Sequence, residues 1–431
     1  MLAAVAVGVL LWRGVELPHA AVLEVERAAA EMRGGKPVSV GRLHLIFSEG
    51  ALRLRAEDVR SLTGAPATRP RPVQADFSFS PAALLEGRLG LQRADLSGGD
   101  VTITLRRGGE TAIAFGRPGA EPDFVAPKAA QDVPLALRAR QLLDAAAEAL
   151  QSGAAHERLA HLRFDRAQLH VVDERSGRIW RAEDARFDLR RKGERLALQL
   201  GATLRTDAGR GRLDAALHSE TGLRTAHLEI QLQDALVRLL AGPKQILGAV
   251  QAPFSLKLAA DVTREAGVEA LDVSAHADAG SLHLGGEDWA FDRADLAGRY
   301  TLAPDVLALE RLEIAGARVR IAGSGRVQDL APLLSGETGA PVRFDVEMPV
   351  LEVASSQLEA PLILRELALI GAYRPATRQL AVESAGFRIG GAHAGVSATL
   401  AWDRANPGAA PGLRAAATLA GAVTEIGRAH V

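Results

Sequence analysis

The sequence predicts a mainly β fold, a long antiparallel meander with a few short helices and an N-terminal membrane anchor. The meander either closes its apolar face with a second sheet, as a sandwich or barrel, or forms an elongated curved sheet or groove that lipid or a partner covers. Apolar and polar residues alternate with a period of two over most of the chain, as in 196–200, 228–232 and 254–258. Turn signals such as Ser176-Gly177 and Lys192-Gly193 separate these segments. Because a period of two places successive side chains on opposite faces, the segments are half-buried strands.

Four helices are expected among the strands. Apolar residues recur at helical spacing over 18–33, before a glycine doublet that ends the helix. Ser80-Pro81 is typical of a helix start and predicts one helical turn over 81–86. The amphipathic segments 133–151 and 233–241 predict two further helices.

These patterns divide the chain into six parts. We expect a partial transmembrane anchor at 1–17, a β region with short helices at 18–106, and a Gly- and Pro-rich linker at 107–131. A helix at 132–152 precedes the extended antiparallel β region at 153–424. Residues 425–431 look like the translation of a sequencing adapter, so we expect them to lie outside the fold and the native protein to continue.

The N-terminal run, residues 1–12, is apolar or Gly throughout. It is shorter than the roughly 20 residues that cross a bilayer. One interpretation is the apolar core of a secretory signal, and the other is the second half of a transmembrane anchor. No basic segment precedes the run and no A-x-A site closes it, which favours the anchor.

Composition excludes several classes of function. The formal net charge is -1 and aromatic residues make up 4% of the chain, which argues against nucleic acid as a partner. The chain contains no Cys, so thiolate nucleophiles and disulfides are excluded. The 11 His residues form no H-x-H or H-x-x-x-H pair, which favours solvent-facing strand positions over metal binding.

No motif indicates catalysis or a cofactor. The doublet Gly98-Gly99 is typical of a hairpin turn and not of a phosphate loop. The acidic pairs Glu57-Asp58 and Glu183-Asp184 are adjacent on strands, where neighbouring side chains point to opposite faces. We therefore interpret them as turn and edge charges, and expect no enzyme activity, no cofactor and no metal site.

Short tetrads recur along the chain. Residues 55–58 and 181–184 both read Arg-Ala-Glu-Asp, and residues 93–96 and 293–296 both read Arg-Ala-Asp-Leu. A serial architecture would produce such tetrads. Chance in an Ala- and Arg-rich composition would also produce them.

One region resembles a known family. The segments 38–43, 51–59, 75–89 and 94–103 are similar to the N-terminal region of the AsmA-like superfamily, and most similar to its YhdP and TamB types. The most specific piece is a strand, a Ser-Pro turn, one helical turn and the strand that starts Gly87-Arg-Leu89. The remaining strands, from residue 159 onward, share only the general meander of that family.

This resemblance implies an inner-membrane-anchored periplasmic protein of a Gram-negative bacterium, which carries phospholipid between the inner and outer membranes along an apolar β-groove. Its partners would be membrane phospholipid, the inner membrane and outer-membrane or envelope proteins. The alternative is a structural or assembly factor for envelope biogenesis that binds partner strand edges without carrying lipid. The candidate lipid-binding residues share one parity within each strand: Leu89, Leu91, Val101, Ile103, Leu105, Leu196, Leu198, Leu200, Leu228, Ile230 and Leu232.

Overall fold

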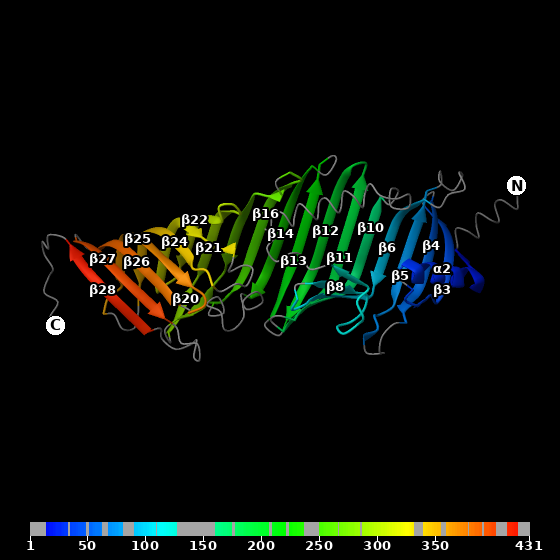
Figure 1. Cartoon of the computed structure of the whole chain (residues 1–431), viewed down its shortest axis with the longest axis horizontal. Coiled ribbons are helices and arrows are strands. Elements are labelled where there is room, and N and C mark those ends of the chain that lie inside the picture. Colours follow the sequence, from blue (N-terminus) through cyan, green and yellow to red (C-terminus); the bar gives the residue numbers. More distant parts are fainter. Residues whose placement is uncertain are drawn as a thin grey trace. The chain divides into compact units, whose positions relative to one another are not determined.

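The structure, a computed structural model, confirms the mainly β fold (Figure 1). The chain divides into two compact units, unit 1 (Met1–Ile230 and Val262–Gly267) and unit 2 (Gln231–Asp261 and Val268–Val431). The structure describes residues 14–32, 35–48, 51–62, 68–80, 90–108, 110–126, 160–174, 177–206, 209–220, 224–236, 250–265, 267–284, 287–331, 339–354, 359–377, 379–389, 392–401 and 412–420.

Unit 1 consists of strands and one described helix. Its elements are β1 (Val15–Glu16), α2 (His19–Met32), β2 (Val38–Ser39), β3 (Arg42–Ser48), β4 (Ala51–Ser61), β5 (Val73–Phe79), β6 (Leu91–Gly98), β7 (Asp100–Leu105), β8 (Thr111–Ala114), β9 (Phe124–Ala126), β10 (His161–Asp173), β11 (Arg178–Lys192), β12 (Arg195–Thr206) and β13 (Gly209–Ser219). Strands β14 (Thr225–Leu236), β16 (Pro253–Thr263) and β17 (Gly267–Val268) contain residues of both units.

Two antiparallel meanders in unit 1 meet at a parallel pairing. Strands β3 to β6 form the first meander, and β1 and β2 pair with β3 and β4 at its start. Strands β10 to β13 form the second. Strand β10 lies parallel to β6 and β7, so the expected purely antiparallel order is wrong at this position. A parallel pair needs a long connection, and residues 106–160 separate β7 from β10 along the chain.

Helix α2 covers the first strands of unit 1, which confirms the helix predicted over 18–33. Its Ala-rich sequence favours a helix, and Val22 enters a core in which Leu43 is 1% exposed. Glu26 accepts a hydrogen bond from the backbone N–H of Val40 at 2.8 Å and so joins the helix to the sheet. The core cluster contains Val22, Val40, Leu43, Ala56 and Ala75, with Leu17, Ala21, Val25, Leu54, Val59, Phe77 and Leu96 packed against it.

A line of β-bulges, here called the bulge line, crosses unit 1. Asp58, Arg166 and Asp184 adopt positive φ angles of 58°, 55° and 51°, and each lies where the register shifts against a neighbouring strand. Gly98 and Gly99, with φ of 88° and 84°, occupy the same line between β6 and β7. Bulges bend a strand and increase its twist. The buried side chains beside the line on one face are small: Ala56, Ala75, Ala167, Ala182 and Ala202.

Unit 2 is an antiparallel sheet with a smaller one beside it. The main sheet runs from β16 through β18 (Ala270–Ala277), β21 (Arg293–Thr301), β22 (Val306–Ala315), β23 (Val319–Gln328), β24 (Val342–Val353), β25 (Leu362–Arg374), β26 (Gln379–Ile389), β27 (Ala392–Ala401) and β28 (Gly412–Ala420). The smaller sheet contains β15 (Val250–Gln251), β19 (Gly280–Leu284) and β20 (Glu287–Phe291).

The core of unit 2 lies on one face of its main sheet. Phe291 of the smaller sheet packs with Ala252 and with Val319 of β23 on that face. Met348, Leu367 and Ala385 form a second cluster farther along the sheet. Register shifts next to Met348 and Leu367 give unit 2 bulges of its own.

One corner of unit 2 is fixed by Asp305. The Tyr300 hydroxyl donates a 2.7 Å hydrogen bond to Asp305 Oδ1. The backbone N–H groups of Leu330 and Ala331 donate to the same carboxylate at 3.0 to 3.2 Å. Tyr300 is 5% exposed, and burial together with this hydrogen bond raises the pKa of its phenol.

Several local expectations are wrong. Gly98-Gly99 is not a hairpin turn, because Arg93 pairs with His161 and Asp100 with Gln168, so β6 and β7 run in one direction. Residues 233–236 are not helical, since β14 continues through them to Leu236. The expected linker at 107–131 contains β8 and β9, whose few residues are too short to show a period.

Other expectations concern the ends of the chain and two further helices. Val15 pairs with Leu45 in the sheet and Leu17 packs on the core, so the end of the segment assigned to an anchor belongs to unit 1. Residues 1–13, the helices expected over 81–86 and 132–152, and residues 425–431 lie outside the described residues. Within the described part, no helix combines the length and the apolar character needed to cross a membrane.

We expect Gly98→Ala to lower the free energy of unfolding by about 1–3 kcal/mol. A Cβ at this position would lie 2.9 Å from the Pro72 carbonyl oxygen, at a φ of +88° that side chains rarely adopt. Urea denaturation followed by circular dichroism measures the change.

Gly108→Ala is the control, because a Cβ at Gly108 would meet nothing within 4 Å. Its effect should stay within about 0.5 kcal/mol. Equal losses for the two variants would show that the bulge at Gly98 does not require glycine.

Candidate functional site

The strand register of unit 1 gathers apolar side chains on one face, here called the apolar face. Leu198 pairs with Leu189 on one side and Leu217 on the other. Side chains of directly paired residues lie on the same face of a sheet. Following the pairings from β4 to β13 gives a row of Leu54, Phe77, Ala94, Leu162, Leu189, Leu198 and Leu217, and a second row of Ala56, Ala75, Leu96, Phe164, Phe187, Leu200 and Ala215.

The apolar face continues across the bulge line. Val101 pairs with Leu169, which pairs with Ala182, which in turn pairs with Leu204. Strand β12 has no bulge, so Leu204 lies on the same face as Leu198 and Leu200. In β10 and β11 the apolar residues change parity at the bulge, and the extra residue returns them to this face.

The structure brings many of the predicted lipid-binding residues to this face. Leu198 and Leu200 lie in the two rows, while Val101 and Ile103 lie beyond the bulge line, and all four side chains are half-buried. Leu91 pairs with Phe79 after a register shift, which places it on the same face as Phe77.

Two more candidates lie on the apolar face at the ends of their strands. Leu105 has the parity of Ile103 and is 37% exposed, and Leu196 has the parity of Leu198 and pairs with Arg191 at the end of β11. On β14, Leu228 and Ile230 are half-buried residues of unit 1, whereas Leu232 belongs to unit 2 and is 5% exposed. Leu89 lies outside the described residues.

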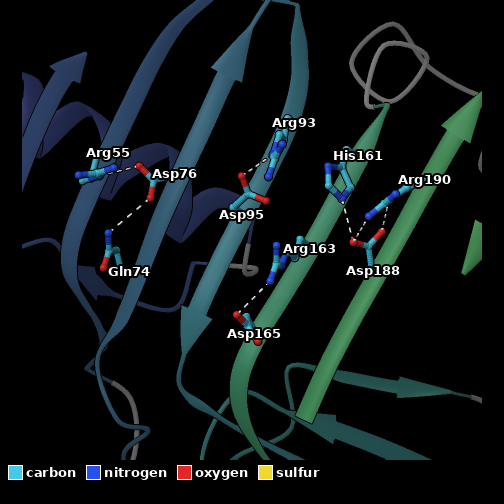
Figure 2. Close-up of polar contacts among 10 residues, drawn as sticks. All are labelled: Arg55, Gln74, Asp76, Arg93, Asp95, His161, Arg163, Asp165, Asp188 and Arg190. Carbon is cyan, nitrogen blue, oxygen red and sulfur yellow. Dashed lines mark hydrogen bonds and ion pairs between the residues drawn. The ribbon is translucent and has the colours of Figure 1, made fainter. Parts of the chain in front are cut away.

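The opposite face of the same strands, here called the polar face, carries a lattice of ion pairs (Figure 2). Arg55 Nε contacts Asp76 Oδ1 at 2.7 Å across β4 and β5. Asp188 is shared between Arg190 Nε at 2.8 Å and His161 Nε2 at 3.2 Å. Burial by itself would raise the pKa of Asp188, but its hydrogen bonds with Arg190 and His161 lower it below the ordinary value.

Sequence reasoning missed this lattice, although its signal is in the sequence. An Arg and an Asp two positions apart recur on the strands of unit 1, at 93 and 95, 163 and 165, 188 and 190, and 212 and 214. Residues at i and i+2 of a strand share a face, so each such pair can form an ion pair along its own strand. The contacts Arg93–Asp95, Arg163–Asp165 and Arg212–Asp214 all form in this way.

The repeated tetrads have a structural role at the bulge line. The Arg-Ala-Glu-Asp segments each place a nearly buried Ala, Ala56 or Ala182, two residues before an Asp with positive φ. The acidic pairs 57–58 and 183–184 are therefore bulge residues within β4 and β11, and not the turn and edge charges that were expected. Asp tolerates the left-handed region better than most residues, which explains its place there.

Asp100, at the start of β7, is the most deeply buried charge of unit 1 among the described residues, with 2% exposure. Its Oδ2 accepts the Arg71 backbone N–H at 2.7 Å and lies 3.6 Å from Arg71 Nε and 3.8 Å from Arg117 Nε. His170 Nε2 lies 3.5 Å from Oδ1. His170 is 8% exposed, so the expectation of a solvent-facing side chain is wrong for this residue.

The surroundings of Asp100 hold two loop segments against β7. Next to it, Thr102 Oγ1 donates to the Gly116 carbonyl at 2.7 Å, and the Arg117 N–H donates to the Thr68 carbonyl at 3.0 Å. Burial would raise the pKa of Asp100, but His170, the Arg71 N–H and the two guanidinium groups lower it overall. The cluster stabilises the sheet beside Gly98 and Gly99, and its chemistry is that of a buried ion pair.

No group of three potential metal ligands occurs among the His, Asp and Glu residues of the described ranges. Comparison with protein-family models, with curated proteins and with solved structures finds no match for this chain.

We expect Asp100→Asn to lower the free energy of unfolding at pH 7 by about 2–4 kcal/mol, because two guanidinium groups lose a buried partner. A carboxylate whose pKa is lowered by folding stabilises the protein above its unfolded pKa of about 3.9, and that contribution is lost as pH falls through the folded value. The difference between variant and wild type should therefore shrink below about pH 4. Urea denaturation of both proteins at pH 7 and below about pH 4 tests this.

Asp214→Asn is the control, since Asp214 pairs with Arg212 at the surface. It should change stability by less than about 1 kcal/mol. A penalty for Asp100→Asn that stays constant down to about pH 3 would contradict the role of the ionised carboxylate.

Proposed function

We propose that the apolar face of unit 1 binds acyl chains, and that the protein takes part in phospholipid transport between the inner and outer membranes of a Gram-negative envelope. The observation that carries this proposal is the pair of apolar rows that extend from β4 to β13 with large side chains left half-buried. The resemblance to the AsmA-like superfamily supports the same role.

Packing supports a ligand on this face. Val22 of helix α2 is buried in one cluster with Ala56 and Ala75 of this face, so the helix covers the first strands of the face. Leu189, Leu198 and Leu217, farther along the row, remain partly exposed to solvent. Covering such a surface with an acyl chain is favourable by roughly 0.8 kcal/mol for each buried CH2 group.

The bulge line supports a groove. Bulges in neighbouring strands bend a sheet along the line that joins them. The buried alanines along this line have Phe164 and Phe187 on one side and Val101 and Leu204 on the other. A sheet that folds toward its apolar face needs such small side chains at the fold. Acyl chains need apolar area and no hydrogen bonds, which matches such a surface and a role without catalysis.

To test the function, a photo-crosslinking residue is placed at Leu198, and at Gln199 as the matched control. Leu198 pairs with Leu189 and Leu217 on the apolar face, while Gln199 pairs with Asp188 on the polar face. We expect phospholipid adducts in cells at Leu198 and several-fold fewer at Gln199. Ile103 and Thr104 form a second such pair on β7.

Equal labelling at Leu198 and Gln199, or no labelling at either residue, would reject a lipid-binding face. Ile103→Asp separates a groove from a sealed core. Loss of envelope integrity at normal protein level fits a blocked groove. Loss of the protein itself fits a closed core, in which an unpaired charge costs several kcal/mol. That outcome would favour the alternative role as an assembly factor without lipid.

We also propose that the protein is anchored in the inner membrane with its bulk in the periplasm, as the apolar segment 1–12 and the resemblance indicate. Alkaline phosphatase fused after Thr424, in a chain with its native N-terminal segment, should be active in cells. The enzyme needs oxidising conditions for its disulfides, so activity reports export. An inactive fusion, together with an active cytoplasmic reporter at the same position, would contradict this topology.

A further inference from the structure

Cations gather at one end of the polar face of unit 1, where β6, β10 and β11 lie side by side. Arg93 pairs with His161 in the parallel register, and His161 pairs with Arg190 in the antiparallel register. These three side chains therefore form one cross-strand row. Figure 2 shows Arg93, His161 and Arg190 on the same face as Asp95 and Asp188 of the next row.

The nearby carboxylates do not balance this charge. Asp95 contacts Arg93, and Asp188 is shared by Arg190 and His161, while Arg163 contacts Asp165. At the end of β11, Lys192 shares the parity of Arg190 and adds one more cation to this face, whereas the neighbouring Arg191 has the opposite parity. Among the described residues, three carboxylates thus face four permanent cations, Arg93, Arg163, Arg190 and Lys192, together with His161.

An open depression lies at this cationic end. Its volume is about 620 Å³, and none of its described lining residues is a carboxylate. The residues that line it are Arg93, Ala160, His161, Arg163, Arg190, Arg191 and Lys192.

We propose that this depression, here called the cationic depression, is a binding site for a phosphate group. The inference goes beyond the proposed function, because the site lies on the polar face and does not depend on acyl chains binding opposite it. The phosphate could belong to a soluble phosphorylated compound or to a lipid head group, which present the same oxygens.

Phosphate is the chemical class that these side chains fit best. A guanidinium group presents a planar fork of donors that matches two phosphate oxygens, and a Lys ammonium adds a compact charge. A phosphomonoester carries between one and two negative charges at pH 7, so it gains more from several cations than a carboxylate does. Arg190 donates from Nε and Nη2 to Asp188, and its side chain is 67% exposed, so the edge formed by its two terminal nitrogens can still face a ligand.

A neighbouring depression provides an internal comparison. It measures about 260 Å³ and shares Arg93 and Arg163 with the cationic depression. Asp76, Asp95 and Asp165 also line it, so its charges are balanced. The cationic depression has Arg190, Arg191 and Lys192 in its lining where the neighbouring depression has those carboxylates. An anion should therefore bind more tightly in the cationic depression.

The experiment measures binding of inorganic phosphate to the whole chain by isothermal titration calorimetry, and binding of vesicles by co-sedimentation. The vesicles contain phosphatidylcholine alone or with phosphatidic acid. We expect the double variant Arg190→Gln, Lys192→Gln to weaken binding by about tenfold or more, because two charge-assisted contacts are lost. Binding of inorganic phosphate indicates a soluble ligand, whereas binding of phosphatidic acid vesicles alone indicates a lipid head group.

Arg212→Gln is the matched control. Arg212 contacts Asp214 with the same 2.8 Å Nε distance and the same 67% exposure as Arg190 with Asp188, but it lies outside the cationic depression. The control should bind as the wild type does, and circular dichroism melts should agree for all three proteins. Absence of binding to both probes, or equal weakening by Arg212→Gln, would overturn the proposal.

Discussion

Cross-strand register is the constraint on which unit 1 depends. Its sheet has one apolar and one charged face, and a slip of one residue would exchange them along a whole strand. Two neighbouring residues of β12 show this register. Leu198 pairs with Leu189 and Leu217 on the apolar face, and Gln199 pairs with Asp188 on the polar face. Any such slip would place an arginine or aspartate among leucines, at a cost of several kcal/mol for each unpaired charge.

The bulge line allows the strands to bend without losing this register. Arg166 and Asp184 each insert an extra residue, so β10 and β11 change parity while β12 does not. Without the insertions, Leu169 and Ala182 would turn to the charged face. Gly98 and Gly99 continue the bulge line between β6 and β7, the strands that lie parallel to β10. There the Pro72 carbonyl and the Val73 side chain leave no room for a Cβ. Asp100 then holds the covering loops against that position.

Several expectations from the sequence are confirmed by the structure, and the failures have physical causes. The helix over 18–33 and the strands at 196–200, 228–232 and 254–258 follow from the local period of apolar residues, which the geometry of each segment decides. Gly98-Gly99 was misread because positive φ serves hairpins and bulges alike. The segment 233–236 was misread because Asp234 adopts a φ of 52° within β14, and the buried positions change parity there, from Leu232 to Ala235.

The sequence by itself determined which side chains share a face within each strand, because alternation depends only on the backbone of that strand. It therefore predicted Leu198 and Leu200, or Val101 and Ile103, as members of one apolar face. Only the tertiary structure decided which strands lie together, since the parallel pairing of β6 with β10 joins residues separated by the whole segment 99–160. That pairing unites Arg93 with His161 and Arg190 and buries Asp100 beside His170. Such contacts depend on long-range packing, which no local period encodes.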